Sequence, residues 1–219
     1  MLLALAQLQP TPGNVDANIQ KHLRMTEQAA AAGAELIVFP ELSLTGYEPK
    51  LAKQLACDQH DNRFDIFQTL SDKEKITICL GMPVKSENGI HISMLIFRPG
   101  KERLIYSKQH LHTDELPYFV PGTEQVILNI DGYKIAPAIC YESLLPEHAA
   151  AVAKSGADIY LSSVAKPANG VTKAYKHFPE IAKHHGMTVV MANCTGPCDN
   201  FLSVGQSAVW NNNGKLTGK

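Results

Sequence analysis

The chain has 219 residues, of which 45% are hydrophobic and 19% are charged, and its formal net charge is -1. This composition is typical of one globular domain with a sizeable core and excludes an intrinsically disordered chain. No block of Lys or Arg stands out, so the charge pattern argues against nucleic acid or an anionic membrane as a partner.

The first half of the chain is predicted to alternate between strands and helices. A strand at 2–8 is followed by a helix at 16–32, for which Asn14 or Asp16 is the expected N-cap. Gly33 stands where a left-handed C-terminal cap belongs. The next predicted elements are a strand at 36–39, helical segments within 50–73, and strands at 76–84, 90–97 and 103–106.

The second half adds hairpins to this pattern. Asn88-Gly89 and Asp131-Gly132 are typical of tight hairpin turns between strands. The later predicted elements are strands at 125–130 and 133–139, a helix at 146–155, a strand at 158–161, a helix at 173–185, and strands at 187–192 and 203–210. Hairpins mixed with strand–helix–strand units predict mixed sheets layered with helices. No repeat or linker interrupts the chain, so we expect a single domain over residues 1–219.

Three predicted strands end at a residue type that nucleophilic catalysis uses. Apolar runs of the sequence stop at Glu41, at Lys108 and at Cys140. Ionisable side chains at strand ends indicate a pocket at the edge of a sheet. The three residues together supply a base, a cation and a nucleophile.

Cys140 lies between an apolar strand and a helix start at Pro146, an order similar to the nucleophile elbow of other hydrolases. A free thiol has a pKa of about 8.5, so an adjacent base or cation must activate it. A cysteine considered alone is more often a small buried hydrophobe, and we interpret Cys57 and Cys79 in that way.

Glu41 and Lys108 fit the activating roles. A carboxylate in a poorly solvated site has a raised pKa and accepts a proton from a thiol, and a nearby ammonium stabilises the thiolate and an oxyanion. Each residue considered alone also fits a solvated position, as a Glu at a surface strand end or a Lys in a polar loop.

The motifs around these residues resemble the nitrilase superfamily of carbon–nitrogen hydrolases. They are FPELSLTGY at 39–47, YSKQHL at 106–111, and ICYE at 139–142 followed by Pro146-Glu147. Their order, neighbouring residues and spacing all match, and the resemblance covers essentially the whole chain. It implies that Glu41 is the general base, Lys108 the cation of the triad and Cys140 the nucleophile.

The resemblance also implies further site residues. The family has a second glutamate shortly before a Pro-Gly turn, where it positions the substrate and the lysine. Glu115 occupies that place, with the adjacent Asp114 as the alternative. The backbone N–H of Tyr141 is expected to complete the oxyanion hole, and Tyr47 is expected among the substrate-binding residues.

For the whole protein, the resemblance implies a four-layer α-β-β-α sandwich with two mixed sheets, paired into a homodimer. The implied reaction needs neither a metal nor an organic cofactor. The thiolate attacks an amide carbonyl, ammonia or an amine leaves, and water then hydrolyses the thioester with Glu41 as the base.

Two departures from the family pattern limit what can be carried over. Many members have Asn-Arg where this chain has Asn193-Cys194, so substrate contacts there are not transferred. Members also continue with a further strand and tail where this chain reaches Lys219, soon after the predicted turn at 211–214. We expect the last strand and tail of the family to be absent here.

The five cysteines are an odd number, and the apolar start of the chain has no basic segment before it and is soon broken by Gln residues. This favours reduced thiols and a cytoplasmic location. Cys194 and Cys198, with His184 and His185 upstream, fit zinc-ligand spacing poorly because of the three-residue gap and the missing second Cys pair. We therefore expect no metal.

These observations favour a hydrolase that cleaves the C–N bond of a small linear amide or carbamoyl compound through a Cys thioester. The alternatives are nitrile hydrolysis by the same triad and a non-catalytic binding or scaffold protein. Nitrile-cleaving members of the family usually have Trp after the nucleophile, whereas this chain has Tyr141. The presence of all four site residues argues against a non-catalytic protein.

We predict that an alkylating amide analogue modifies Cys140 before the other four cysteines, because Cys140 alone combines a strand end with the family motif. Peptide mapping by mass spectrometry measures the order of labelling. Labelling of Cys57, Cys79, Cys194 or Cys198 while Cys140 stays unmodified would contradict the assignment. Cys140→Ala should fold normally and lose turnover.

Overall fold

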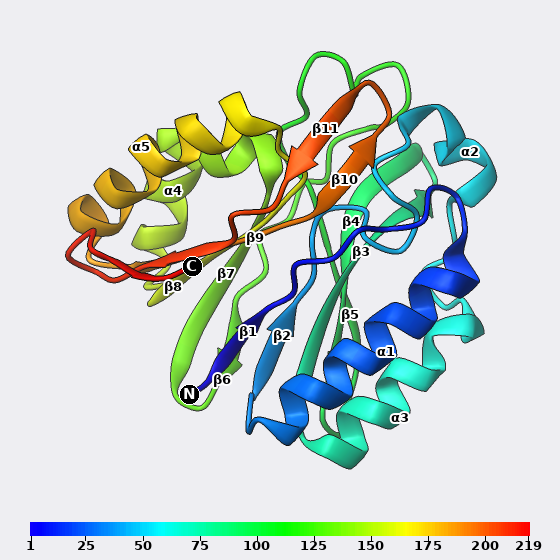
Figure 1. Ribbon diagram of the computed structural model, residues 1–219, viewed down its shortest axis with the longest axis horizontal. Coiled ribbons are helices and arrows are strands. Elements are labelled where there is room, and N and C mark those ends of the chain that lie inside the picture. The colour runs from blue at the N-terminus through cyan, green and yellow to red at the C-terminus, as the bar shows by residue number, and fades with distance from the viewer.

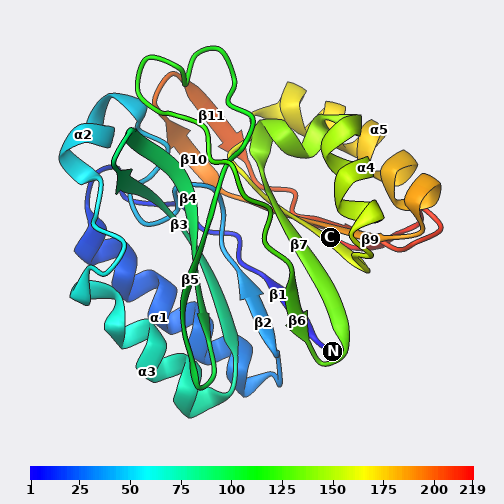
Figure 2. The same ribbon diagram turned by 180° about the vertical axis from the view of Figure 1, so that it is seen from behind.

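Two mixed β-sheets lie face to face, with helices on both outer faces (Figures 1 and 2). The computed structural model describes residues 1–219. In spatial order, the first sheet contains β1 (Leu3–Leu5), β2 (Leu36–Val38), β3 (Thr77–Ser86), β4 (Gly89–Arg98) and β5 (Lys101–Ser107). The second contains β13 (Leu216–Gly218), β12 (Ala208–Trp210), β9 (Thr188–Asn193), β8 (Ile159–Val164), β7 (Tyr133–Ile139) and β6 (Leu128–Ile130).

The helices complete the outer layers. They are α1 (Val15–Ala31), α2 (Ala52–Leu55), α3 (Asp65–Glu74), α4 (Pro146–Lys154) and α5 (Ala168–His185), with short 3₁₀ turns at Pro49–Leu51, Asn62–Phe64 and Cys140–Leu144. Helices α1 and α3 cover the first sheet, and α4 and α5 cover the second. The predicted four-layer α-β-β-α sandwich is therefore confirmed. None of the helices combines the length and apolar content that crossing a bilayer would need.

Strand β2 shows why the sequence forms buried layers. Leu36 and Val38 point into the core between the two sheets, whereas Ile37 and Phe39 pack on the other face, against the helices. Side chains alternate between the faces of a strand, so a strand covered on both faces must be apolar throughout. The continuous apolar run of this segment is thus a direct consequence of the layer architecture.

The strand predicted at 203–210 is wrong in part. The structure has two strands there, β11 (Phe201–Val204) and β12, and β11 forms a separate hairpin with β10 (Thr195–Cys198). Gly205 and Gln206 both have positive φ, +66° and +59°, which is incompatible with a continuous strand. The chain therefore changes direction between the hairpin and the second sheet, and β13 follows β12 as a further short strand.

The direction of the strands gathers several chain segments at one end of the sandwich. β2 and β3 are parallel, and two antiparallel pairings give β5 the same direction as β3. In the second sheet β7, β8 and β9 are mutually parallel. Ser163 at the end of β8 donates a hydrogen bond across the sheets to the carbonyl of Phe39 after β2 (2.8 Å). The carboxyl ends of both groups of strands therefore meet.

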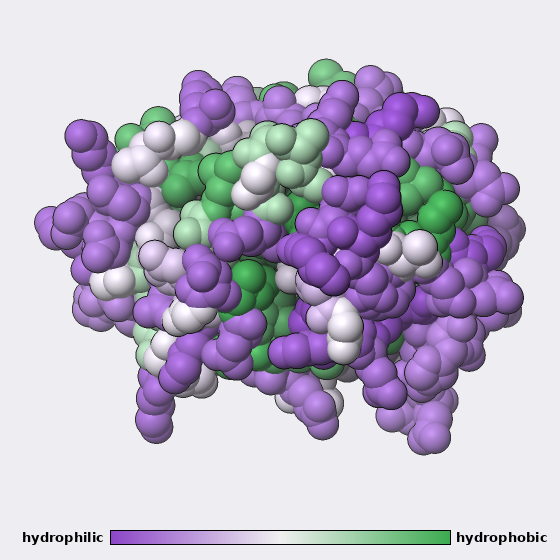
Figure 3. Space-filling view, turned by 90° about the horizontal axis from the view of Figure 1, so that it is seen from below, coloured by the Kyte–Doolittle hydropathy of each residue, from purple (hydrophilic) through white to green (hydrophobic).

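The other end of the sandwich carries the chain start. There the Met1 amino group lies 3.2 Å from the Asp131 carboxylate. Figure 3 views this end, where polar side chains dominate and apolar ones form separate areas between them.

Gly81 on β3 allows the backbone around Glu41 to pass very close to β3. A Cβ at this position would lie 2.3 Å from the backbone nitrogen of Leu42 and 2.5 Å from the carbonyl oxygen of Pro40. The Gly81 carbonyl also accepts a hydrogen bond from Leu44 N–H (3.0 Å). The absence of a side chain therefore permits the close approach.

We predict that Gly81→Ala destabilises the fold by about 1–3 kcal/mol, the usual cost of overpacking, because neighbouring backbone must move. Urea unfolding measures the change. Gly218→Ala is the matched control, since a Cβ there meets only ordinary contacts at 3.5 Å with Val209. Equal stability of both variants would show that the crossing segment is not tightly packed.

Candidate active site

Cys140 occupies a sharp turn between β7 and the helical segment that leads into α4. It is the first residue of the 3₁₀ turn Cys140–Leu144, and its φ of +49° is unusual for a residue with a side chain. Such strain of about 1–3 kcal/mol persists where surrounding structure fixes it, commonly at active sites. The half-buried Cys140 is thereby lifted out of the strand at the end where the other strands meet.

Lys108 lies at the centre of the site. Its Nζ donates hydrogen bonds to Oε1 of Glu41 (2.8 Å) and to Oε1 of Glu115 (2.6 Å), and all three side chains are buried. Glu41 follows β2, Lys108 follows β5, and Glu115 comes from the long loop between β5 and β6. Three distant segments therefore converge on one ammonium group.

Glu115, and not Asp114, contacts Lys108. The Glu115 carboxylate also accepts hydrogen bonds from the Tyr47 hydroxyl (3.0 Å) and from His112 N–H (2.7 Å). Asp114 is exposed and pairs with the His112 ring. Of these two neighbours, Glu115 is the one that the structure brings to the predicted site.

Of the two predicted tyrosines, Tyr47 contacts this group and Tyr141 lies against His112 in the neighbouring loop. Tyr47 is buried, and its ring lies 5.5 Å from that of Phe201 on β11, so the β10–β11 hairpin packs on the site. Tyr141 is half-buried, with its ring edge-on to His112 at 5.1 Å.

The charges of the site influence one another strongly. Burial raises the pKa of Glu41, and the Lys108 charge opposes that rise. Burial lowers the pKa of Lys108, but Glu41 and Glu115 outweigh it, so the net pKa is raised and the lysine stays protonated. Burial and the Glu41 charge raise the pKa of Cys140 to about 11. The resting nucleophile is therefore a thiol, and an acceptor must remove its proton.

Glu41 has a free acceptor for that proton. Its Oε1 binds Lys108, whereas its buried Oε2 has no hydrogen-bond partner. Buried carboxylate oxygens are normally paired, so an unpaired one is an expected feature of a site that receives a proton. Cys140 lies close enough to affect the pKa of Glu41.

Glu142 links the segments that carry Lys108 and Cys140, a role the sequence did not reveal. Its Oε1 accepts hydrogen bonds from Tyr106 OH (2.6 Å) and Ile139 N–H (2.7 Å). Its Oε2 accepts them from the N–H groups of Gln109 (2.6 Å) and His110 (3.1 Å). The only signal in the sequence was its place in the ICYE motif.

Lys166 is a second residue that sequence reasoning missed. It follows β8, is buried, and its Nζ lies 3.6 Å from Sγ of Cys140. The predicted strand at 158–161 stops three residues before the observed end of β8 at Val164, so Lys166 looked like a loop residue. An ionisable side chain two residues after the full strand gives a signal similar to that of Lys108.

None of the remaining cysteines hydrogen-bonds to Cys140 Sγ, whose contacts are with Ala165 and Lys166. Burial raises the pKa of Cys57 to about 11 and that of Cys79 to about 12, as expected for packed thiols. Cys194 and Cys198 are free thiols with sulfur atoms 3.7 Å apart. No group of three or more His, Cys, Asp or Glu side chains is arranged to hold a metal ion.

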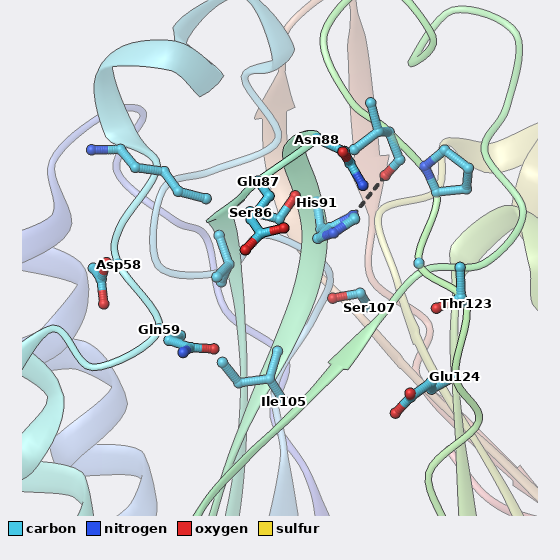
Figure 4. A pocket seen from close by; sticks show the side chains of 15 residues that line it. Asp58, Gln59, Ser86, Glu87, Asn88, His91, Ile105, Ser107, Thr123 and Glu124 are labelled. Carbon is cyan, nitrogen blue, oxygen red and sulfur yellow. Dashed lines mark hydrogen bonds between the residues drawn. The ribbon is translucent and has the colours of Figure 1, made fainter.

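A surface cavity of about 940 Å³, shown in Figure 4, is lined by other residues than this group. It lies along β5 and the end of the β3–β4 hairpin, where His91 Nδ1 hydrogen-bonds to the Val120 carbonyl (2.9 Å). Its lining includes Ser107 but none of the charged residues that surround Cys140. We therefore locate the candidate site by its chemistry at the strand ends.

Comparison with known proteins identifies the family of the chain. The family model for "Carbon-nitrogen hydrolase" matches residues 2–219. A glutamine-dependent NAD(+) synthetase of Acinetobacter baylyi is 27% identical over 98% of this chain, which spans only 41% of that protein's length. A nitrilase of Pyrococcus abyssi is 26% identical over 94% of this chain and 80% of its own.

Solved structures share the fold. The amidase from Nesterenkonia sp. AN1 superimposes with a TM-score of 0.89 at 24% identity, covering 98% of this chain and 86% of its own. In a variant of that amidase, the acetamide moiety of fluoroacetamide is attached covalently to the active-site cysteine. The chain described here belongs to the carbon–nitrogen hydrolase family, within the nitrilase superfamily.

We predict that Glu142→Gln destabilises the protein by about 2 kcal/mol or more, because an amide NH₂ would face donors and leave buried N–H groups unpaired. Glu147→Gln, at an exposed position on α4, is the control. Chemical unfolding of both variants measures the difference. A Glu142→Gln variant as stable as the control would mean that this carboxylate does not hold the two segments together.

Proposed function

We propose that the protein hydrolyses the C–N bond of a small linear amide, with Cys140 as nucleophile, Glu41 as general base and Lys108 as the cation of the triad. The observation that carries the proposal is the unpaired, buried Oε2 of Glu41 beside a thiol with a raised pKa. A base with a free lone pair and a nucleophile that needs deprotonation are complementary.

The first half of the reaction forms a thioester. Glu41 takes the thiol proton, and the sulfur attacks the amide carbonyl. Lys108 and the backbone N–H of Tyr141 stabilise the oxyanion, and Glu115 holds Lys108 in place. Protonated Glu41 then returns the proton to the leaving nitrogen, which departs as ammonia or an amine.

Water completes the cycle. Glu41 is a base again after the amine has left, so it deprotonates a water molecule that attacks the thioester carbonyl. The sulfur leaves as a thiolate and recovers its proton from Glu41. One carboxylate therefore serves both halves of the reaction.

An amide is favoured over a nitrile as substrate because Tyr141, and not Trp, follows the nucleophile. The buried charge arrangement also supports an enzyme over a non-catalytic scaffold. Three ionised groups are costly to bury, and a protein without turnover gains nothing from an unpaired carboxylate oxygen among them.

A glutamine amide is a second candidate substrate. The observation that favours it is the similarity to glutamine-dependent NAD(+) synthetases over nearly the whole of this chain. Glutamine is itself a small linear primary amide, so the same residues would release its ammonia. A homodimeric assembly, a cytoplasmic location and the absence of a nucleic-acid or membrane partner belong to the same proposal.

A panel of compounds tests the function directly. Simple primary amides, N-carbamoyl amino acids, dicarboxylic monoamides, glutamine and nitriles are each incubated with the protein, and released ammonia is measured. Release from amides or carbamoyl compounds supports the proposal and identifies the substrate. Release from nitriles alone, or from no compound while Cys140 stays unreactive, would overturn it.

We predict that Glu41→Gln lowers kcat on the best substrate by roughly a hundredfold or more, because the amide keeps the side chain's shape but accepts no proton. Glu115→Gln should also be impaired, because Lys108 loses its second carboxylate. Asp114→Asn is the matched control and should keep wild-type activity. A dead Asp114→Asn variant beside a fully active Glu115→Gln variant would reverse the choice between these neighbours.

A further inference from the structure

Lys166 places a second buried ammonium beside the nucleophile. The residue is 4% exposed, and its Nζ donates to the Cys140 sulfur at 3.6 Å. No carboxylate lies within salt-bridge distance of this lysine, unlike Lys108, which has two. A buried lysine without a carboxylate is uncommon, so its charge needs another counterpart.

The backbone of Lys166 is held from both sides. Its N–H donates to Oδ1 of Asn193 (2.8 Å), and its carbonyl accepts from Nδ2 of the same side chain (3.1 Å). Ser203 Oγ also donates to that carbonyl (3.0 Å). One asparagine at the end of β9 therefore fixes both peptide groups of Lys166, which directs its side chain toward Cys140.

The net charge of the buried groups around Cys140 indicates the role of the Lys166 ammonium. Lys108 with ionised Glu41 and Glu115 has a net charge of -1, because one cation faces two carboxylates. When the Cys140 proton moves to Glu41, that carboxylate becomes neutral and the negative charge moves to sulfur, so the total without Lys166 stays at -1. Lys166 brings the sum to zero, and the sum stays zero when the Cys140 proton moves to Glu41.

The effect on Cys140 agrees with this count. Burial and the Glu41 charge raise the pKa of the Cys140 thiol, and the Lys166 charge lowers it more than the Lys108 charge does. Lys108 is committed to the two carboxylates, whereas Lys166 has only the sulfur as a side-chain partner.

We propose that Lys166 is a second catalytic lysine, whose ammonium stabilises the Cys140 thiolate while Lys108 orders the carboxylates and faces the oxyanion. The inference rests on the proposed cysteine mechanism. The S–H bond breaks heterolytically, the electron pair stays on sulfur, and the proton goes to Oε2 of Glu41. Lys166 keeps all its protons, and its ion pair with sulfur is lost when the S–C bond forms.

The test is the pH dependence of Cys140 alkylation by iodoacetamide, a neutral probe, in wild type, Lys166→Met and Lys166→Arg. Peptide mapping gives the rate at Cys140 itself. The midpoint of the profile should rise by about one pH unit or more in Lys166→Met, with labelling at neutral pH slowed about tenfold. Lys166→Arg keeps the charge and should stay much closer to wild type.

Two further variants make the result decisive. Lys173→Met removes an exposed lysine of α5 and should leave the profile unchanged. Lys166→Gln replaces the Met variant if Met unfolds the chain, which thermal unfolding shows, and should give the same rise. An unchanged profile in a folded Lys166→Met or Lys166→Gln variant overturns the inference.

Steady-state kinetics separate this role from substrate binding. Loss of thiolate stabilisation should lower kcat on neutral and anionic amides alike. A raised KM for anionic amides only, with normal alkylation, would make Lys166 a substrate anchor and overturn the proposal. Failure of the wild type itself to label at Cys140 or to release ammonia would count against the proposed function instead.

Discussion

The contact of one ammonium with two buried carboxylates is the constraint on which the site depends. Lys108, Glu41 and Glu115 are all removed from water, and none can be buried alone without a large cost. Each comes from a different part of the chain, so the three must arrive together. The buried ion group therefore forms only when the ends of β2 and β5 and the loop after β5 are all in their final positions.

The layered architecture around this ion group could be predicted in outline because buried strands require long apolar runs in the sequence. A strand covered on both faces, such as β2, is mainly apolar on both, and the apolar run in its sequence shows this directly. Charged residues that interrupt or end such runs stand out for the same reason. This explains why the sequence alone singles out Glu41, Lys108 and Cys140 and predicts mixed sheets layered with helices, whereas the four-layer sandwich is what the family resemblance implies.

Other features of the structure are not indicated by apolar runs in the sequence. Glu142 acts through backbone N–H groups of Gln109 and His110, and a sequence does not show which backbone groups converge on a carboxylate. The break between β11 and β12 depends on two positive φ angles. One of them is at Gln206, and glutamine is not a typical turn residue. Lys166 was missed because the end of β8 was placed too early. Only the Glu142 contacts depend on tertiary structure throughout, whereas Lys166 would follow from a correct end of the strand.

In the proposed mechanism the two lysines stabilise different negative charges, Lys108 those of the carboxylates and Lys166 that of the thiolate. Lys108 donates to both carboxylates, and its charge is still balanced by Glu115 after Glu41 has taken the thiol proton, so it is not the main partner of the thiolate. Lys166 has no carboxylate within salt-bridge distance, its backbone is held by Asn193 and its ammonium contacts sulfur, so it is free for that purpose. Burial enlarges the difference between the two lysines. A low dielectric strengthens both the repulsion between the Cys140 thiolate and the carboxylates and the attraction between the thiolate and Lys166. The same burial that makes Cys140 a poor acid thus makes the position of this second cation decisive for its reactivity.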